Sequence, residues 1–253
     1  MSLRMFIGQN KSGKIPPFAN TYIEEYGALY NRYCLDGIAT DGWRVPESRD
    51  LLRDYLGDVA NELKSERTEP APEGETDVGI ATDEHPRWDY HDSAYGTDKY
   101  KFNGLPSSHR HENGDFSGSL GIIGERLLIH TTEIVFGEYT AISIRYDSTA
   151  IWRLRFDTQK KGFAIRVIRD ATANEQDSEH VDFIAEETII PNEYTGHDGK
   201  KYDAVRIGEQ VWITENLKET KRMVGEDIVD IPIVTDDTEW SELETAAMCA
   251  YPK

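Results

Sequence analysis

Cysteines and basic residues are scarce in this sequence. Its 253 residues include two cysteines, Cys34 and Cys249, too far apart for a zinc-type pair and too few for a disulfide framework. We expect two free, buried thiols, with a single bridge as the alternative. Lys and Arg number 28 against 47 Asp and Glu, which gives a formal net charge of -19. Such an acidic protein repels phosphate backbones, so nucleic acid is not an expected partner.

Long apolar runs are also missing. No segment approaches the roughly 18 to 20 apolar residues that a membrane-spanning helix needs, so we expect no membrane insertion. The N-terminal stretch "MSLRMFIGQNKSGKIPPF" contains no continuous apolar run and no small-residue cleavage site, which predicts that the protein does not use the general secretory route. No segment repeats at a period of about 20 to 50 residues, which argues against a solenoid or a propeller.

Changes in composition and hydrophobic pattern divide the chain into four parts. Residues 1–17 form an N-terminal arm that ends in two prolines, and residues 18–170 form a main body. Residues 171–193 contain no Lys or Arg and are interpreted as an acidic connector. Residues 194–253 bring a second group of strand patterns. A chain of this length can bury a sizeable core as one large domain or two small ones.

Helical periodicity occurs early in the main body. Aromatic and apolar residues at helical spacing predict a helix within residues 20–34, which Gly27 weakens. A longer apolar stripe predicts a second helix over residues 47–64. Residues 65–100 are acidic and rich in Pro, Gly and Thr, so they are interpreted as a long surface excursion. A short helix is also expected near residues 240–248.

Strand patterns follow from residue 102. The stretches "RLLIHTTEIVF", "TAISIRYD", "IWRLRFD" and "FAIRVIRD" are β-branched and aromatic, and turn residues separate them. In the last two stretches apolar and charged residues alternate, which predicts strands with one solvent-exposed face. Two further strands, 202–207 and 210–214, are expected to pair around Gly208-Glu209.

The stretch "DGWRVPESRD", residues 41–50, predicts a structural corner before the second helix. Trp43 is interpreted as a core side chain, and Arg44 is expected to reach a carboxylate or a backbone carbonyl. Pro46 can occupy the helix entrance because the first turn needs no amide donor there. A ligand site at this corner is the alternative interpretation.

Several motifs in order resemble one family. The stretches "YGALYNRYC", "GWRVP", "FNGLPSSHRHENGDF" and "GFAIRVIRD" are similar to elements of the Fibrobacter succinogenes major paralogous domain. They span roughly residues 22–170. The resemblance implies a C-type-lectin-like fold, of the α+β class, with two helices packed on short antiparallel sheets and long loops. It also implies kinship with formylglycine-generating enzymes and with retroelement-diversified variable proteins.

One matching motif lies out of order. The family's opening motif, "DGxxYxxVxIGxQxWMxENL", is matched by "DGKKYDAVRIGEQVWITENL" at residues 198–217, after the rest of the domain. We expect residues 194–253 to supply the opening strands of the same domain in circularly permuted order. Two alternatives are strand exchange with a neighbouring subunit and a truncated second copy.

A few histidines and cysteines are candidate metal ligands or catalytic groups. His109 and His111 lie on one side of a strand and could ligate a metal, but the family places a variable loop here. The motifs of calcium-binding lectins are missing, so no metal and no cofactor is expected. Cys34 and Cys249 could meet as in the formylglycine-generating oxidases, although non-catalytic members also carry the second cysteine. No hydrolase triad order, phosphate loop or HExxH motif is visible, so we expect that the protein is not an enzyme and has no catalytic residue.

The late strands carry the candidate ligand or partner surface. Aromatic and arginine side chains dominate recognition surfaces, and the corresponding region of variable lectin-like proteins faces the ligand. By alternation, Arg153 and Arg155 are expected to face solvent, with Trp152, Leu154 and Phe156 turned inward. The candidate surface residues are Tyr139, Arg145, Tyr146, Arg153 and Arg155.

Together these patterns predict a non-enzymatic structural or binding protein. A virion protein assembled in the host cytoplasm needs no export signal, so we expect a bacteriophage fibre, tail or decoration subunit used for attachment. Its partners would be a host-surface glycan or protein, or other virion subunits, and we expect a homo-oligomer, with a trimer as one candidate. The alternatives are a bacterial cell-surface adhesin of the same fold and, more distantly, a formylglycine-generating-like oxidase.

Overall fold

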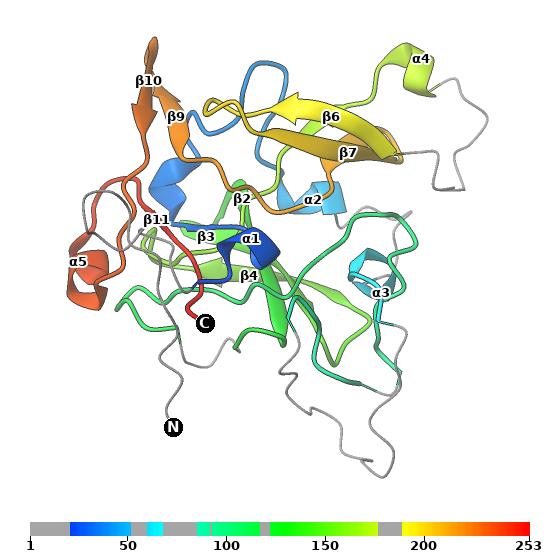
Figure 1. Cartoon of the computed structure of the whole chain (residues 1–253), viewed down its shortest axis with the longest axis horizontal. Helices are drawn as coiled ribbons and strands as arrows, with labels where there is room; N and C mark the ends of the chain where they lie inside the picture. Colours follow the sequence, from blue (N-terminus) through cyan, green and yellow to red (C-terminus); the bar gives the residue numbers. More distant parts are fainter. Residues whose placement is uncertain (1–20, 52–59, 68–84, 92, 117–121, 177–188) are drawn as a thin grey trace, which may run out of the picture.

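Short antiparallel sheets make up most of the regular structure of the protein (Figure 1). This structure is a computed structural model, and it describes residues 21–51, 60–67, 85–91, 93–116, 122–176 and 189–253. Short helices and small antiparallel sheets are mixed, which is compatible with the α+β class that the resemblance implies. Within the described ranges the helical segments are short: α1 (Ile23–Tyr26), η1 (Arg32–Cys34), α2 (Ser48–Leu51), α3 (Ala60–Leu63), α4 (Ala173–Gln176) and α5 (Asp237–Glu242).

A four-stranded antiparallel sheet joins the end of the main body to the C-terminal part of the chain. Its order is β5 (Ile168–Asp170), β8 (Gln210–Ile213), β7 (Lys201–Ile207) and β6 (Ile189–Thr195). Ile207 pairs with Gln210, which leaves Gly208-Glu209 as a two-residue turn with Gly208 at φ 62°. Such turns need positive φ, which glycine adopts freely. The predicted hairpin is confirmed.

The remaining strands form three smaller units. β2 (Arg126–Val135), β3 (Glu138–Arg145) and β4 (Ile151–Phe156) form a sheet with β3 in the middle and β4 at one side. β9 (Lys221–Val224) and β10 (Asp227–Asp230) form a hairpin, and β1 (Leu29–Tyr30) pairs with β11 (Met248–Cys249).

The two ends of the described chain lie side by side. Thr21 forms an antiparallel bridge with Pro252, and the Tyr22 amide donates to the Tyr251 carbonyl at 2.9 Å. The C-terminus accordingly lies close to α1 in the view of Figure 1. In this structure the contacts between residues 194–253 and the main body are made within one chain. That these strands are the permuted opening strands of the family's domain stays a prediction.

Both parts of the chain contribute to the principal core clusters. One cluster packs Tyr30 and Ile165 of the main body against Tyr202 and Met248 of the C-terminal part. A second cluster combines β2 and β3 side chains with Trp212 of β8. Burying one such large apolar side chain contributes roughly 1.5 to 3 kcal/mol. The main body and the C-terminal part therefore share their hydrophobic cores.

The helix predicted within residues 20–34 is wrong over its middle. α1 ends at Tyr26, and Gly27 adopts φ 81°, outside the helical region. The Ala28 amide then donates to the Leu217 carbonyl, and Tyr30 exchanges backbone hydrogen bonds with Phe163. Long-range backbone pairing therefore overrides the helical spacing of the aromatic residues, because each strand amide finds its partner outside the segment.

Two other predicted boundaries shift, and one predicted helix is described at its ends alone. The helix over 47–64 is seen at its two ends, α2 and α3, and its middle lies outside the described residues. The helix expected near 240–248 begins earlier, since Asp236 caps α5 by accepting from the Glu239 amide at 2.9 Å. Residues 189–193 of the acidic connector are not linker, because they belong to strand β6.

The stretch "FAIRVIRD" departs from the predicted strand with one solvent-exposed face. Only Ile168–Asp170 forms a regular strand, and Arg166 is fully buried. The Arg166 guanidinium donates to the carbonyls of Phe102, Asn103 and Ile213 and to the Asn216 side chain. Alternation correctly predicted that apolar side chains of this stretch are buried, but it could not reveal that this arginine is also buried and donates to carbonyls.

Candidate functional site

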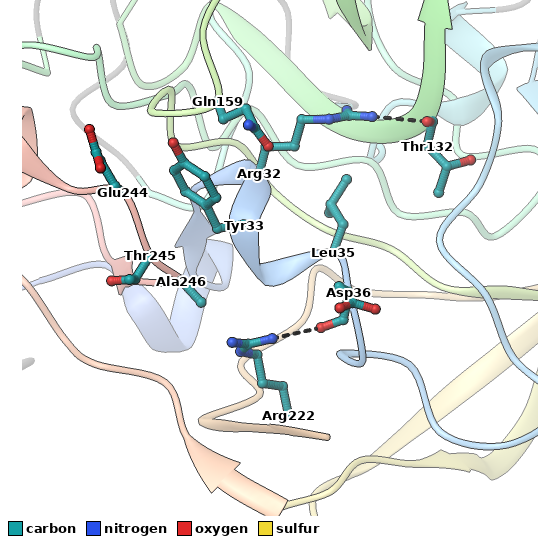
Figure 2. Close-up of a pocket in the computed structure, with 10 residues that line it drawn as sticks. All are labelled: Arg32, Tyr33, Leu35, Asp36, Thr132, Gln159, Arg222, Glu244, Thr245 and Ala246. Atoms are coloured by element: carbon teal, nitrogen blue, oxygen red, sulfur yellow. Dashed lines mark hydrogen bonds between the residues drawn. The ribbon is translucent and has the colours of Figure 1, made fainter. Parts of the chain in front are cut away.

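An open pocket of about 620 Å³ lies where η1, β2, β9 and the segment after α5 meet (Figure 2). Ten residues from separate parts of the sequence line it, and most of them are polar. The lining residues are Arg32, Tyr33, Leu35, Asp36, Thr132, Gln159, Arg222, Glu244, Thr245 and Ala246. We call this feature the polar pocket.

Asn31 positions one wall of the polar pocket against another. Its side-chain amide donates to the Thr245 carbonyl at 2.8 Å, and its side-chain oxygen accepts from the Ala247 amide at 3.1 Å. Asn31 directly precedes η1, which carries Arg32 and Tyr33. The buried amide of the "YGALYN" stretch therefore fixes the 244–246 segment beside η1. Without this segment of the C-terminal part, one wall would be missing.

Arg32 forms part of the pocket wall under unusual electrostatic conditions. Its guanidinium donates to the carbonyls of Thr131 and Thr132, at 2.5 and 2.9 Å, and lies 4.6 Å from the Tyr139 ring centroid. Burial lowers the pKa of Arg32, and the nearby Tyr139 opposes this effect. The positive charge is thus stabilised by carbonyl oxygens and by a cation–π contact with the Tyr139 ring.

Arg222 of β9 faces the same pocket from the other side, as Figure 2 shows. Its Nη1 donates to the Asp36 carbonyl at 3.1 Å, and the neighbouring Met223 amide donates to the Gly37 carbonyl at 2.8 Å. Gly37 has φ 75°, and a Cβ there would lie 2.0 Å from the Met223 carbonyl oxygen. Only glycine therefore permits β9 to approach this turn.

Tyr33 and Glu244 provide an aromatic ring and a carboxylate at one edge of the pocket. Partial burial, followed by the negative charge of Glu244, raises the pKa of Tyr33. The phenol therefore stays protonated and can donate a hydrogen bond at neutral pH. Gln159 adds an amide that both donates and accepts. These groups place hydrogen-bond donors and hydrogen-bond acceptors around the Tyr33 ring.

The predicted surface residues do not gather in one place. Tyr139 and Arg145 stand at opposite ends of β3, six residues apart, which corresponds to about 20 Å along a strand. Arg155 pairs with Glu138 at 3.1 Å, near Tyr139. Only Tyr139 approaches the polar pocket, through its contact with Arg32.

At the other end of β3, Arg145 is held by a bidentate contact with Asp147, at 2.6 and 2.8 Å. Tyr146 is half-buried and packs against the second core cluster. Arg153 is exposed on β4. Two of the five predicted residues therefore have intramolecular carboxylate partners, and the candidate surface is split into two ends with Arg153 between them.

The prediction that Trp152 faces inward is wrong. Its side chain is 51% exposed, whereas Leu154 and Phe156 are partly buried against the small cluster around Phe163. β4 is paired on one side only in the three-stranded sheet. Alternation assigns these three residues to one face, but it does not report how far that face is covered.

At the corner, Arg44 donates from Nη1 and Nη2 to the two oxygens of the Asp50 carboxylate, at 2.6 and 3.2 Å. The Arg44 hydrogen bonds hold the pKa of Asp50 below its usual value despite burial. Trp43 is half-buried and makes an edge contact with Tyr194 at 5.2 Å. Pro46 is buried, and its carbonyl accepts from the Thr132 amide at 2.9 Å. The corner thus fastens the start of α2 to the β2 segment that lines the pocket.

The histidine and cysteine candidates occupy buried positions. His109 is fully buried, and burial, followed by the charge of His111, lowers its pKa to about 3. Cys34 and Cys249 are free and buried, as the sequence predicts, and burial raises the pKa of each thiol to about 12. Within the ranges that the structure describes, no group of three or more His, Cys, Asp and Glu side chains is arranged to hold a metal ion.

No family model, no curated protein and no solved structure matches the chain. Among the described residues, no helix is long and apolar enough to cross a membrane. The sequence did not predict the polar pocket, because its lining residues come from five separate segments.

Proposed function

We propose that the protein is a non-enzymatic binding protein with a C-type-lectin-like fold, and that the polar pocket takes a saccharide. In this proposal the protein serves attachment as a bacteriophage fibre, tail or decoration subunit. A bacterial cell-surface adhesin of the same fold is the alternative setting. The observation that carries the binding function is the pocket itself: an open polar cavity that contains an aromatic ring, an amide, carboxylates and two guanidinium groups.

The chemistry of the polar pocket suits a sugar. A pocket of about 620 Å³ falls within the range of about 300 to 1,000 Å³ that is usual for small ligands. A sugar ring offers hydroxyl groups that both donate and accept, and the Gln159 amide, the Glu244 carboxylate and the Thr245 hydroxyl can meet them. The apolar face of a sugar can lie against the Tyr33 ring, as aromatic side chains combine an apolar body with a polar end.

The thiol environment favours binding over oxidase chemistry. A thiolate is the reactive form of cysteine, and a pKa of about 12 for Cys34 and Cys249 leaves both thiols protonated at neutral pH. Both side chains are also buried, at 0% and 1% exposure. These two features support the proposal that the protein is not a formylglycine-generating-like enzyme.

A second surface on β3 and β4 is proposed for contact with other subunits. Exposed aromatic side chains favour it: Trp152 is 51% exposed beside Arg153, and Phe136, at the β2–β3 turn, is 93% exposed near Arg155. Aromatic and arginine side chains are enriched where proteins bind one another. In this proposal the protein is a homo-oligomer, and Tyr139, Arg145, Tyr146, Arg153 and Arg155 belong to the contact surface.

A glycan array tests the saccharide proposal. The unmodified protein is applied beside Tyr33→Ala, which removes the ring from the pocket, and Tyr95→Ala, which removes a 49% exposed tyrosine elsewhere. We expect a defined set of glycans to bind the unmodified protein and Tyr95→Ala equally, and Tyr33→Ala at least about tenfold more weakly. Equal binding by all three proteins, or no glycan bound by any, would contradict the proposal.

A further inference from the structure

In the described part of the chain, the two arginines of the polar pocket lack the carboxylate partners that six other arginines of this acidic protein have. Neither Arg32 nor Arg222 forms an ion pair with a carboxylate of the described residues. Several other arginines lie close to a carboxylate, as expected in a chain with 47 acidic and 28 basic residues. The arginines in such ion pairs are Arg44, Arg49, Arg110, Arg145, Arg155 and Arg169.

The two guanidinium groups have different amounts of free hydrogen-bonding capacity. Arg32 is 9% exposed, and its Nη1 and Nη2 already donate to carbonyls of β2. Arg222 is half-buried, and its one hydrogen bond to the described part of the chain is from Nη1 to the Asp36 carbonyl. Arg222 therefore keeps Nε and Nη2 for a ligand, while Arg32 supplies fixed positive charge to the wall.

We propose that the saccharide bound in the polar pocket carries a carboxylate, which the free edge of Arg222 binds. The proposal rests on the proposed function, because it names the class of sugar that the same pocket takes. The planar Nε and Nη2 pair matches the two oxygens of a carboxylate, so that two parallel charge-assisted hydrogen bonds form. The sugar ring then lies toward Tyr33, and its hydroxyl groups meet Gln159 and Glu244.

The charges of the pocket favour a single negative charge over a double one. Asp36 and Glu244 line the same cavity as Arg32 and Arg222, so carboxylates and guanidinium groups are equal in number. The protein as a whole carries a formal charge of -19. A doubly charged phosphate would meet more repulsion than a carboxylate from these groups. A carboxylated sugar is therefore the favoured ligand, and phosphorylated sugars are a test of the reasoning.

Matched sugar pairs provide the experiment. Glucuronic acid is compared with glucose, galacturonic acid with galactose, and N-acetylneuraminic acid with its methyl ester, by calorimetric titration of the full chain. Charge-assisted hydrogen bonds of this kind correspond to about a tenfold to hundredfold gain in affinity. We expect at least one acid to bind about tenfold or more tightly than its neutral partner, and more tightly than glucose 6-phosphate.

Variants at two arginines locate the preference. Arg222→Gln should remove the preference for the acid and leave the neutral sugar bound as before. Arg222→Lys keeps the charge but loses the planar fork, so it should retain only part of the preference. Arg153→Gln removes the same charge from exposed β4 and should change nothing in sugar binding. Thermal melts confirm that each variant is folded before titration.

The outcomes separate the two proposals. Acidic and neutral partners of equal affinity, with binding still lost in Tyr33→Ala, would overturn the carboxylate proposal and leave saccharide binding intact. A preference unchanged in both Arg222 variants, or a tighter complex with glucose 6-phosphate, would also overturn it. Binding of none of these sugars, together with a blank glycan array, would overturn the proposed function itself.

Discussion

Replacement of Glu219 by Gln should change how the stability of the protein depends on pH. Glu219 is fully buried, and its Oε1 accepts from the Asp198 amide at 2.6 Å. Among the residues that the structure describes, its Oε2 has no hydrogen-bond partner, and it lies 1.5 Å from where a Cβ on Gly196 would be. Burial is the main cause that raises the pKa of Glu219 from 4.5 to about 8, and the charge of Asp198 acts in the same direction.

The sign of the effect follows from where the proton is held. The folded protein keeps the Glu219 proton to a higher pH than the unfolded chain does, so raising the pH through this interval weakens folding. Each pKa unit corresponds to about 1.4 kcal/mol, so a pKa raised from 4.5 to about 8 sets an upper limit of about 5 kcal/mol on the loss. Gln cannot ionise, and it still offers an oxygen to the Asp198 amide.

Urea unfolding at pH 5, 6, 7 and 8 measures this difference. We expect the free energy of unfolding of Glu219→Gln, minus that of the unmodified protein, to rise steadily by at least about 1 kcal/mol from pH 5 to pH 8. The subtraction cancels buried His109 and His130, whose low pKa values give both proteins the same pH dependence. Glu24→Gln, at an exposed carboxylate, serves as the control. A difference that stays flat with pH would refute a buried, protonated Glu219.

Three further substitutions or reactions test other parts of the structure. Trp152→Ala should shift the thermal midpoint by less than about 2 °C, because that side chain is 51% exposed, and a large loss in a melt would contradict its placement. Gly27→Ala should cost more than about 1 kcal/mol in chemical unfolding, since φ is 81° and the new Cβ would lie 2.7 Å from the Asn216 Cβ; a neutral result would contradict this contact. Cys34 and Cys249 should react with a thiol reagent only after denaturant is added, and fast reaction in the native protein would disprove their burial.

Local patterns predicted β2, β3, β4, β7 and β8, but they missed other strands and many of the contacts that fix the fold. The β7–β8 hairpin could be predicted because alternation and Gly208 lie within one short stretch. The break of the helix after Tyr26 could not, because the partners of Ala28 and Tyr30 lie at Leu217 and Phe163. A periodic pattern carries no information about a backbone partner nearly two hundred residues away.

The candidate site was beyond prediction for a related reason. The glycine of the 36–37 turn, Asn31 and Arg222 are each unremarkable in their own stretch of sequence. Their roles depend on β9 and the 244–246 segment lying against η1. The partner of Arg44 could be predicted as a class, a carboxylate or a carbonyl, but the choice of Asp50 required the geometry of the corner.

The most direct measurement of sugar binding is an amide chemical-shift map of the full, isotope-labelled chain during titration with the sugar that gives the strongest array signal. Saccharide binding in the polar pocket predicts that the largest shifts fall on Arg32, Tyr33, Arg222 and the 244–246 segment. Arg153 on β4 should show no shift. Shifts confined to β3 and β4, or no concentration-dependent shift in the pocket, would contradict it.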